Sequence, residues 1–164
     1  MSRSNKYVGH RDPVTMACTI LVEDAAGNRQ ELDPRFDLLN KSPSGLEWGY
    51  NGSGPAQTAL AILVAHLTAP ETHAAVLVAL GETELPDDGR LGLQLHEYLA
   101  IRYFQKFKTR VVSRLPQEDW EMTGEDIERS FLGGCPNDDG RNCTELFSRL
   151  RYANHPHSRR PQHP

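Results

Sequence analysis

Apolar and β-branched residues first cluster between positions 14 and 22, in the run Val-Thr-Met-Ala-Cys-Thr-Ile-Leu-Val. This composition favours a strand. Gly27 and Asn28 then supply turn residues, so residues 29–32 can return as the second arm of a hairpin. Residues 36–48, which contain one proline and one glycine, are predicted to form an irregular or partly helical connector.

Helical spacing appears after a glycine-rich stretch. Four leucine and valine residues between positions 60 and 67 recur at i, i+3, i+4 and i+7, which predicts a helix with one face in the core. Pro55 suits its first turn, and Ser53 or Gly54 its N-cap. Helices are also predicted near residues 71–80 and over 93–115.

Two details of the later helices depend on single residues. Pro116 ends the element over 93–115, and residues 107–115 fit a helix or a strand equally well. Thr123 is expected to cap a last helix over 124–132, because acidic residues follow it in the first turn, where the helix dipole favours them.

These elements predict an α+β fold, in which a small N-terminal antiparallel hairpin or sheet packs against about three to four helices. We expect a disordered N-terminus over residues 1–6, a single α+β domain over 7–133, and an extension over 134–164. The end of the extension, 154–164, has no apolar side chains to offset the entropy of ordering it. A disordered, basic C-terminal tail is therefore expected.

Charge is distributed unevenly along the 164 residues. Residues 149–164 hold four arginines and no acid, and since the whole chain carries −4, residues 1–148 carry −8. An acidic body disfavours non-specific binding of nucleic acid. The odd number of cysteines, three, and the lack of a secretion-signal pattern indicate free thiols and a cytoplasmic protein. No apolar run approaches the roughly 20 residues of a membrane span.

Two stretches resemble a known family. The first is 42–57, which contains Glu-Trp-Gly-Tyr-Asn-Gly-Ser-Gly-Pro-Ala-Gln at 47–57, and the second is 103–116 together with Trp120. They are similar to an uncharacterised family of small domains encoded by bacteria, plasmids and phages. The resemblance runs from about Tyr7 to Leu132 and implies no activity. It marks 69–92 as an insertion and the residues after 133 as an addition.

The stretch 47–57 is the candidate ligand- or partner-binding site. Its candidate residues are Glu47, Trp48, Tyr50, Asn51, Gly52, Ser53, Gly54 and Gln57. Backbone N–H groups before a helix N-terminus can bind anions. The loop nevertheless has neither the Lys-Ser/Thr of a P-loop nor the glycine order of a dinucleotide fold, and Glu47 would repel an anion. Two interpretations stay open: a tight turn that packs Trp48 and Tyr50 onto the helix, or a binding site.

The sequence predicts no metal site and no cofactor. Cys135 and Cys143 are separated by seven residues, whereas zinc knuckles usually have two to four between their cysteines. The candidate catalytic groups are Glu47, Ser53, His66 and His96. The serine lacks the Gly-x-Ser-x-Gly elbow, and the two histidines are expected at the boundaries of amphipathic helices.

By subtraction, we expect a non-catalytic interaction protein of bacterial or mobile-element origin, which contacts an unidentified protein partner through the loop from Trp48 to Gln57. The alternative is an enzyme or a small protein that binds an anionic ligand at the glycine loop. A nucleic-acid-associated protein ranks third, because no recognition motif is present. Its basic helix face would consist of Arg102, Lys106, Lys108, Arg110 and Arg114.

Overall fold

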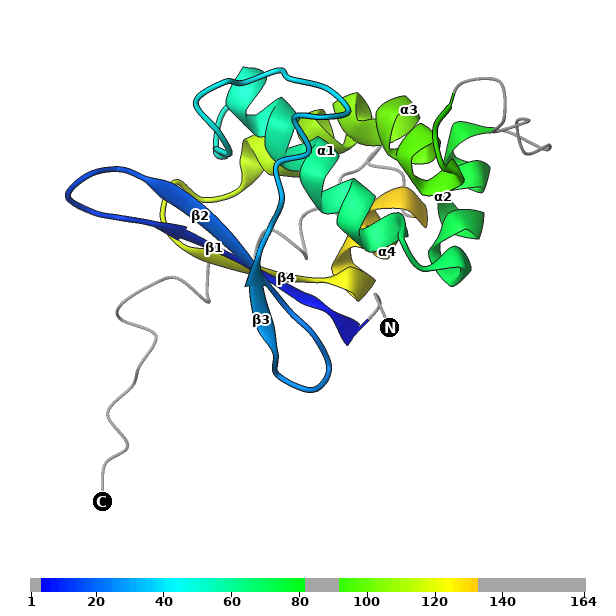
Figure 1. Cartoon of the computed structure of the whole chain (residues 1–164), viewed down its shortest axis with the longest axis horizontal. Helices are drawn as coiled ribbons and strands as arrows, with labels where there is room; N and C mark the ends of the chain where they lie inside the picture. The colour runs from blue at the N-terminus through cyan, green and yellow to red at the C-terminus, as the bar shows by residue number, and fades with distance from the viewer. Residues whose placement is uncertain (1–3, 82–91, 133–164) are drawn as a thin grey trace, which may run out of the picture.

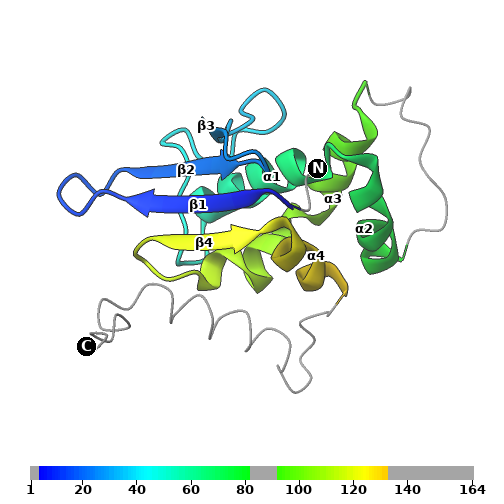
Figure 2. The same cartoon turned by 90° about the horizontal axis from the view of Figure 1, so that it is seen from below.

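The computed structural model describes residues 4–81 and 92–132. A four-stranded antiparallel sheet with the strand order β3-β2-β1-β4 packs against a layer of helices (Figure 1). Figure 2 shows β1, β2 and β4 in front of α1 and α3. The strands are β1 Lys6–Arg11, β2 Cys18–Glu23, β3 Arg29–Glu31 and β4 Trp120–Thr123. The helices are α1 Ser53–Leu67, η2 Pro70–Thr72, α2 His73–Leu80, α3 Leu95–Arg110, η4 Val112–Arg114 and α4 Gly124–Leu132. The predicted α+β fold is confirmed.

Side chains alternate between the two faces of the sheet, as the period of a strand requires. The inner face buries Tyr7, Ile20, Val22, Trp120 and Met122. On the outer face, Glu23 pairs with both neighbouring strands, through Arg29 Nε at 2.6 Å and Lys6 Nζ at 3.8 Å. Lys6 also lies 3.7 Å from Glu121 of β4. The outer face thus carries a line of alternating charges across all four strands.

The strand prediction was only partly right. The expected strand over 14–22 begins at Cys18, because residues 12–17 form a hairpin loop in which Asp12 Oδ1 accepts the N–H groups of Val14 and Thr15. Its pairing with residues 29–31 is as expected. We missed β1 and β4, both short, and Lys6, which we placed in the disordered N-terminus, is the first residue of β1.

Helix α1 is buried on nearly all sides, which corrects the prediction of a single core face. Thirteen of its fifteen residues are buried, because it is packed against α3 as well as the sheet layer. Its N-cap is Gly52, in an extended conformation with φ −166°, and not Ser53 or Gly54. Ser53 is instead the first helical residue, while Pro55 lies in the first turn as expected.

The later helices settle the open question about residues 107–115. Helix α3 continues to Arg110 and is followed by the 3-10 turn η4, so this segment contains no strand. The predicted cap of α4 is confirmed: Thr123 Oγ1 accepts the N–H of Asp126 at 3.1 Å, and Asp126 Oδ2 accepts the N–H of Thr123 at 2.9 Å. This reciprocal pair is a capping box.

Across residues 4–81 and 92–132, no single helix has the length and apolar character needed to cross a membrane; α1 and the segment Pro70–Leu80 meet that test only together, bent by 118°. Cys18 forms no disulfide. The predictions for Cys135, Cys143 and the basic tail fall outside the described residues.

Candidate functional site

Trp48 anchors the candidate loop to the sheet. Its side chain is fully buried, its Nε1 donates to the carbonyl of Glu118 at 3.1 Å, and its ring meets that of Trp120 edge-on at 5.5 Å. The guanidinium of Arg11 lies over the Trp48 ring, 5.1 Å from its centre, and donates to the Trp48 carbonyl at 3.3 Å. The loop is therefore fixed to β1 and to the segment before β4.

The residue that follows, Gly49, adds a second connection. Its N–H donates to the carbonyl of Val112 at 3.1 Å, and its carbonyl accepts from Gln117 Nε2 at 2.6 Å. Its φ of +84° lies in the left-handed region, which favours glycine. Glycine at this position is thus required by the backbone.

Glu47 and Tyr50 form a polar pair above the start of α1. The Tyr50 hydroxyl donates to Glu47 Oε2 at 2.5 Å, and this bond raises the pKa of Tyr50 to about 12. The N–H of Glu47 donates to Thr58 Oγ1 at 3.0 Å. A Cβ on Gly52 would lie 2.6 Å from the Tyr50 ring, and one on Gly54 would lie 2.8 Å from Glu47 Cβ. The two glycines therefore allow close packing of this pair.

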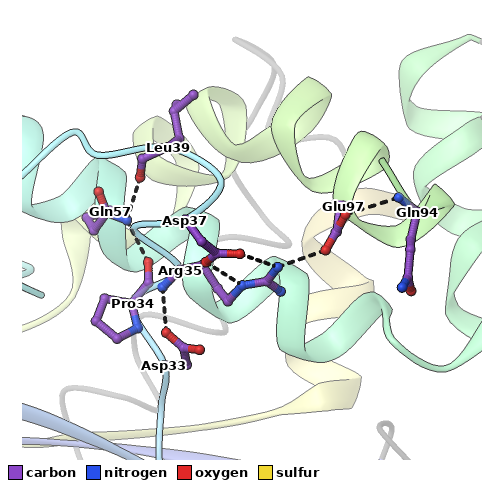
Figure 3. Close-up of polar contacts among 8 residues, drawn as sticks. All are labelled: Asp33, Pro34, Arg35, Asp37, Leu39, Gln57, Gln94 and Glu97. Atoms are coloured by element: carbon purple, nitrogen blue, oxygen red, sulfur yellow. Dashed lines mark hydrogen bonds and ion pairs between the residues drawn. The ribbon is translucent and has the colours of Figure 1, made fainter. Parts of the chain in front are cut away.

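Gln57 fastens the connector before the loop (Figure 3). Its amide nitrogen donates to the carbonyls of Pro34 at 2.6 Å and Leu39 at 3.0 Å. Its amide oxygen accepts the N–H groups of Lys41 at 2.8 Å and Ser42 at 3.4 Å. The side chain is fully buried, and its hydrogen-bonding capacity is used within the fold.

The structure divides the eight candidate residues into two groups. Trp48, Gly54 and Gln57 are buried and belong to the scaffold of the loop. The remaining five form what we call the loop rim, in which Tyr50, Asn51 and Ser53 are exposed and Glu47 and Gly52 are half-buried; its members are Glu47, Tyr50, Asn51, Gly52 and Ser53. That the loop rim contacts a ligand or a partner stays a prediction.

Glu47 also shapes the electrostatics at the start of α1. This helix has no acidic residue in its first turn and no side-chain cap, so its N-terminal N–H groups favour a negative charge nearby. The Glu47 side chain packs against Gly54 in that turn. The protein thereby supplies its own carboxylate where an anionic ligand would otherwise be attracted.

Arg35 is the centre of a second polar network, which the sequence analysis missed (Figure 3). Its Nε and Nη2 donate to the two carboxylate oxygens of Asp37, both at 3.0 Å, and Nη2 also donates to Glu97 of α3 at 2.8 Å. These bonds hold the pKa values of Asp37 and Glu97 below their usual range.

The backbone of Arg35 has a φ of +59°, which is uncommon for a residue other than glycine, and Asp33 Oδ1 accepts its N–H at 2.8 Å. In the sequence, the spacing Asp-Pro-Arg-x-Asp at 33–37 was the signal from which this network around Arg35 could have been predicted.

Of the four candidate catalytic groups, Ser53 is exposed, Glu47 and His96 are half-buried and His66 is buried. His66, in the last turn of α1, is fully buried, which corrects the expectation that it lies at the boundary between the apolar and polar faces of an amphipathic helix; its Nε2 lies 3.7 Å from Glu128 Oε1. Burial lowers the pKa of His96 and raises that of the Cys18 thiol, so both groups favour their neutral forms. Within residues 4–81 and 92–132, no group of three or more His, Cys, Asp and Glu side chains is arranged to hold a metal ion.

The basic residues of α3 and η4 do not form one uniform face. Arg102 and Lys106 are exposed on α3, and Arg114 is exposed on η4. Lys108 and Arg110 are half-buried, and Arg110 Nη1 donates to the hydroxyl of Tyr103 at 2.9 Å.

Comparison with known proteins gives a match over part of the chain. Residues 7–79 match a family described as a family of unknown function (DUF6166). The match includes β1 except its first residue, β2, β3, α1 and the whole of 47–57, whereas α3, β4 and α4 lie outside it. No curated protein and no solved structure matches the chain. The chain is thus similar, over this region, to an uncharacterised family to which no activity is assigned.

Proposed function

We propose that the protein is a non-catalytic interaction protein of the cytoplasm, of bacterial or mobile-element origin, and that it contacts a protein partner through the loop rim. The observation that carries this proposal is the exposure of Tyr50, 43%, on a loop whose other aromatic residue, Trp48, is fully buried. Tyrosine is enriched among residues that dominate binding energy at protein interfaces. Since the buried scaffold already fixes the loop, binding would cost little ordering entropy.

The β1–β2 hairpin loop extends this surface. Val14 and Met16 are 88% and 55% exposed. The strand that leads into the hairpin loop ends at Arg11, whose guanidinium lies over the Trp48 ring and donates to the Trp48 carbonyl. The hairpin loop and the loop rim therefore share one end of the molecule. Neighbouring exposed apolar side chains are typical of interaction surfaces.

The state of the polar groups supports a non-catalytic role. The Glu47 carboxylate accepts a hydrogen bond from Tyr50, and the raised pKa of Cys18 keeps its thiol protonated at neutral pH. The bacterial or mobile-element origin is supported by the resemblance of residues 47–57 to domains from bacteria, plasmids and phages. The match of residues 7–79 is to a family of unknown function, and it is compatible with this origin.

Capture from bacterial lysate, analysed by mass spectrometry, tests the proposal with matched variants. Tyr50→Ser removes the exposed aromatic ring of the loop rim. Phe36→Ser is the control, because Phe36 has a similar exposure of 41% and lies outside the loop rim. We expect a protein that is retained by wild type and Phe36→Ser and lost with Tyr50→Ser, while all three proteins keep the same tryptophan fluorescence. Equal retention by both variants would count against the loop rim.

The anionic-ligand alternative is favoured by one observation, the absence of a side-chain cap and of acidic residues in the first turn of α1. It is tested with inorganic phosphate at constant ionic strength. A rise in the Tm of wild type with phosphate concentration that is lost in Gly52→Val would favour this alternative, because a ligand that binds only the folded state stabilises it by an amount that grows with the ratio of its concentration to its Kd. We expect no such response.

A further inference from the structure

A groove of about 640 Å³ lies between the sheet edge at β3 and the second half of α1. The apolar residues among those that line it, which we call its floor, are Val22, Leu32, Ala61, Val64, Ala65 and Ala69. None of the residues that line the groove belongs to 47–57. The groove is therefore a separate surface from the loop rim, and its volume is typical of ligand and peptide sites.

One side of the groove is an edge strand with outward-facing backbone groups. Leu32 N–H donates to the carbonyl of Ile20, and Asp24 N–H donates to that of Asn28. In an antiparallel ladder the direction of the backbone groups alternates, so residues 28, 30 and 32 bond to β2. The N–H and C=O groups of Arg29 and Glu31 consequently point away from β2. Such an edge can pair with another polypeptide chain.

The charged residues around the groove determine which side chains a bound polypeptide segment should carry. Three acidic residues are among those that line it, Asp24, Glu31 and Asp33. Arg35 is the single basic residue among the lining residues, and its guanidinium is bonded to Asp37 and Glu97. The groove therefore attracts cationic side chains and disfavours anionic ones.

We propose that this groove binds an extended basic segment of a partner protein, which adds to β3 as a fifth strand. The backbone of the segment bonds to Arg29 and Glu31, its apolar side chains lie on the floor, and its lysine or arginine side chains lie near the acidic residues around the groove. Main-chain hydrogen bonds supply affinity in this mode and the alternate side chains supply specificity. The proposal goes beyond the proposed function, because it concerns a different face of the molecule.

The probe is a fluorescein-labelled peptide of alternating valine and lysine, capped at both ends and titrated against the full chain by fluorescence anisotropy. We expect saturable binding. A peptide of alternating valine and glutamate should bind at least tenfold more weakly, and so should the valine–lysine peptide with an N-methyl group on every amide, which leaves no N–H on either edge to pair as a strand. Absence of saturable binding of the first peptide would overturn the proposal.

Two pairs of variants separate the backbone contribution from the charge contribution. Arg29→Pro removes an outward N–H without breaking the β2–β3 ladder, and Arg29→Ala is its control because both lose the ion pair with Glu23. Glu31→Lys reverses a groove charge, and Glu118→Lys makes the same change at an exposed residue outside the groove. We expect about a tenfold weaker affinity for Arg29→Pro and for Glu31→Lys than for their controls. Equal affinities within either pair would refute strand addition to this groove.

Two further measurements identify the occupant and the surface. Tyr50→Ser should bind the peptide with the affinity of wild type. A failure of the groove proposal can then be distinguished from a failure of the loop-rim proposal. Removal of residues 149–164, which carry four arginines, should leave the affinity unchanged. An increase of tenfold or more would mean that the basic tail of this chain occupies the groove, which would overturn the proposal of a partner segment.

Discussion

The substitution Gln57→Leu removes the hydrogen bonds that hold the connector, while it keeps a side chain of similar volume. Four backbone groups lose their partner: the carbonyls of Pro34 and Leu39 and the N–H groups of Lys41 and Ser42. Each intramolecular hydrogen bond contributes roughly 1 kcal/mol net, and a buried group left without a partner costs about 1–3 kcal/mol. Since Pro34 and Leu39 are half-buried, water can reach part of the connector. We therefore expect a loss of about 3 kcal/mol.

Urea denaturation followed by tryptophan fluorescence measures this loss, because Trp48 and Trp120 are both fully buried. For a domain of this size, a loss of about 3 kcal/mol corresponds to a decrease in Tm of roughly 10 °C. The control is Gln105→Leu, the same substitution at an exposed position of α3, for which a change below about 0.5 kcal/mol is expected. A loss below about 1 kcal/mol for Gln57→Leu would refute the argument that this side chain fastens the connector.

Three further predictions follow from the packing, the charges and the sequence. Gly9→Ala should destabilise the protein by more than about 2 kcal/mol in urea denaturation, since its Cβ would lie 2.3 Å from the Trp120 indole; an unchanged midpoint would contradict this close approach. Because Arg35 lowers the pKa values of Asp37 and Glu97 in the folded state, the stability they contribute is present above about pH 4.3 and is lost as the pH falls through the lowered values. The difference in unfolding free energy between wild type and Arg35→Gln should consequently narrow below about pH 4, and a constant difference would count against the network. Removal of residues 154–164 should change the stability by less than about 0.5 kcal/mol, and a large decrease in Tm would show that this segment is docked.

The sequence predicted elements whose signals are local. The start of α4 was predicted correctly because Thr123 and Asp126, three residues apart, form the capping box by themselves. Strand β1 was missed because its pairing partners lie elsewhere: Gly9 faces Ile20 on one side and Trp120 on the other. A glycine within six residues weakens the strand signal, and the requirement for that glycine, contact with Trp120, is visible only in three dimensions.

The candidate site, too, could be predicted only as far as its signals are local. The stretch 47–57 could be singled out from its residues, but not the division between buried scaffold and loop rim. Gln57 bonds to residues 15 to 23 positions earlier in the chain, so its structural role depends on the path of the connector. The burial of α1 was underestimated because its alanines pack closely against neighbours on several sides, whereas a periodicity analysis assigns the core to the leucine and valine positions alone.

The central position of β1 has a consequence for how the chain matures during its synthesis. Strand β1 leaves the ribosome before β4, which it needs as a neighbour, and Gly9 and Trp120 are separated by roughly 110 residues. At 5–20 residues per second, translation takes roughly 5–20 s to cover that distance. During this interval β1 and β2 can form a hairpin, but one edge of β1 stays open and Trp48 lacks the Glu118 carbonyl and the Trp120 ring that later surround it. The nascent chain is then open to mispairing, and a chaperone that shields this edge would act between the synthesis of β2 and that of β4.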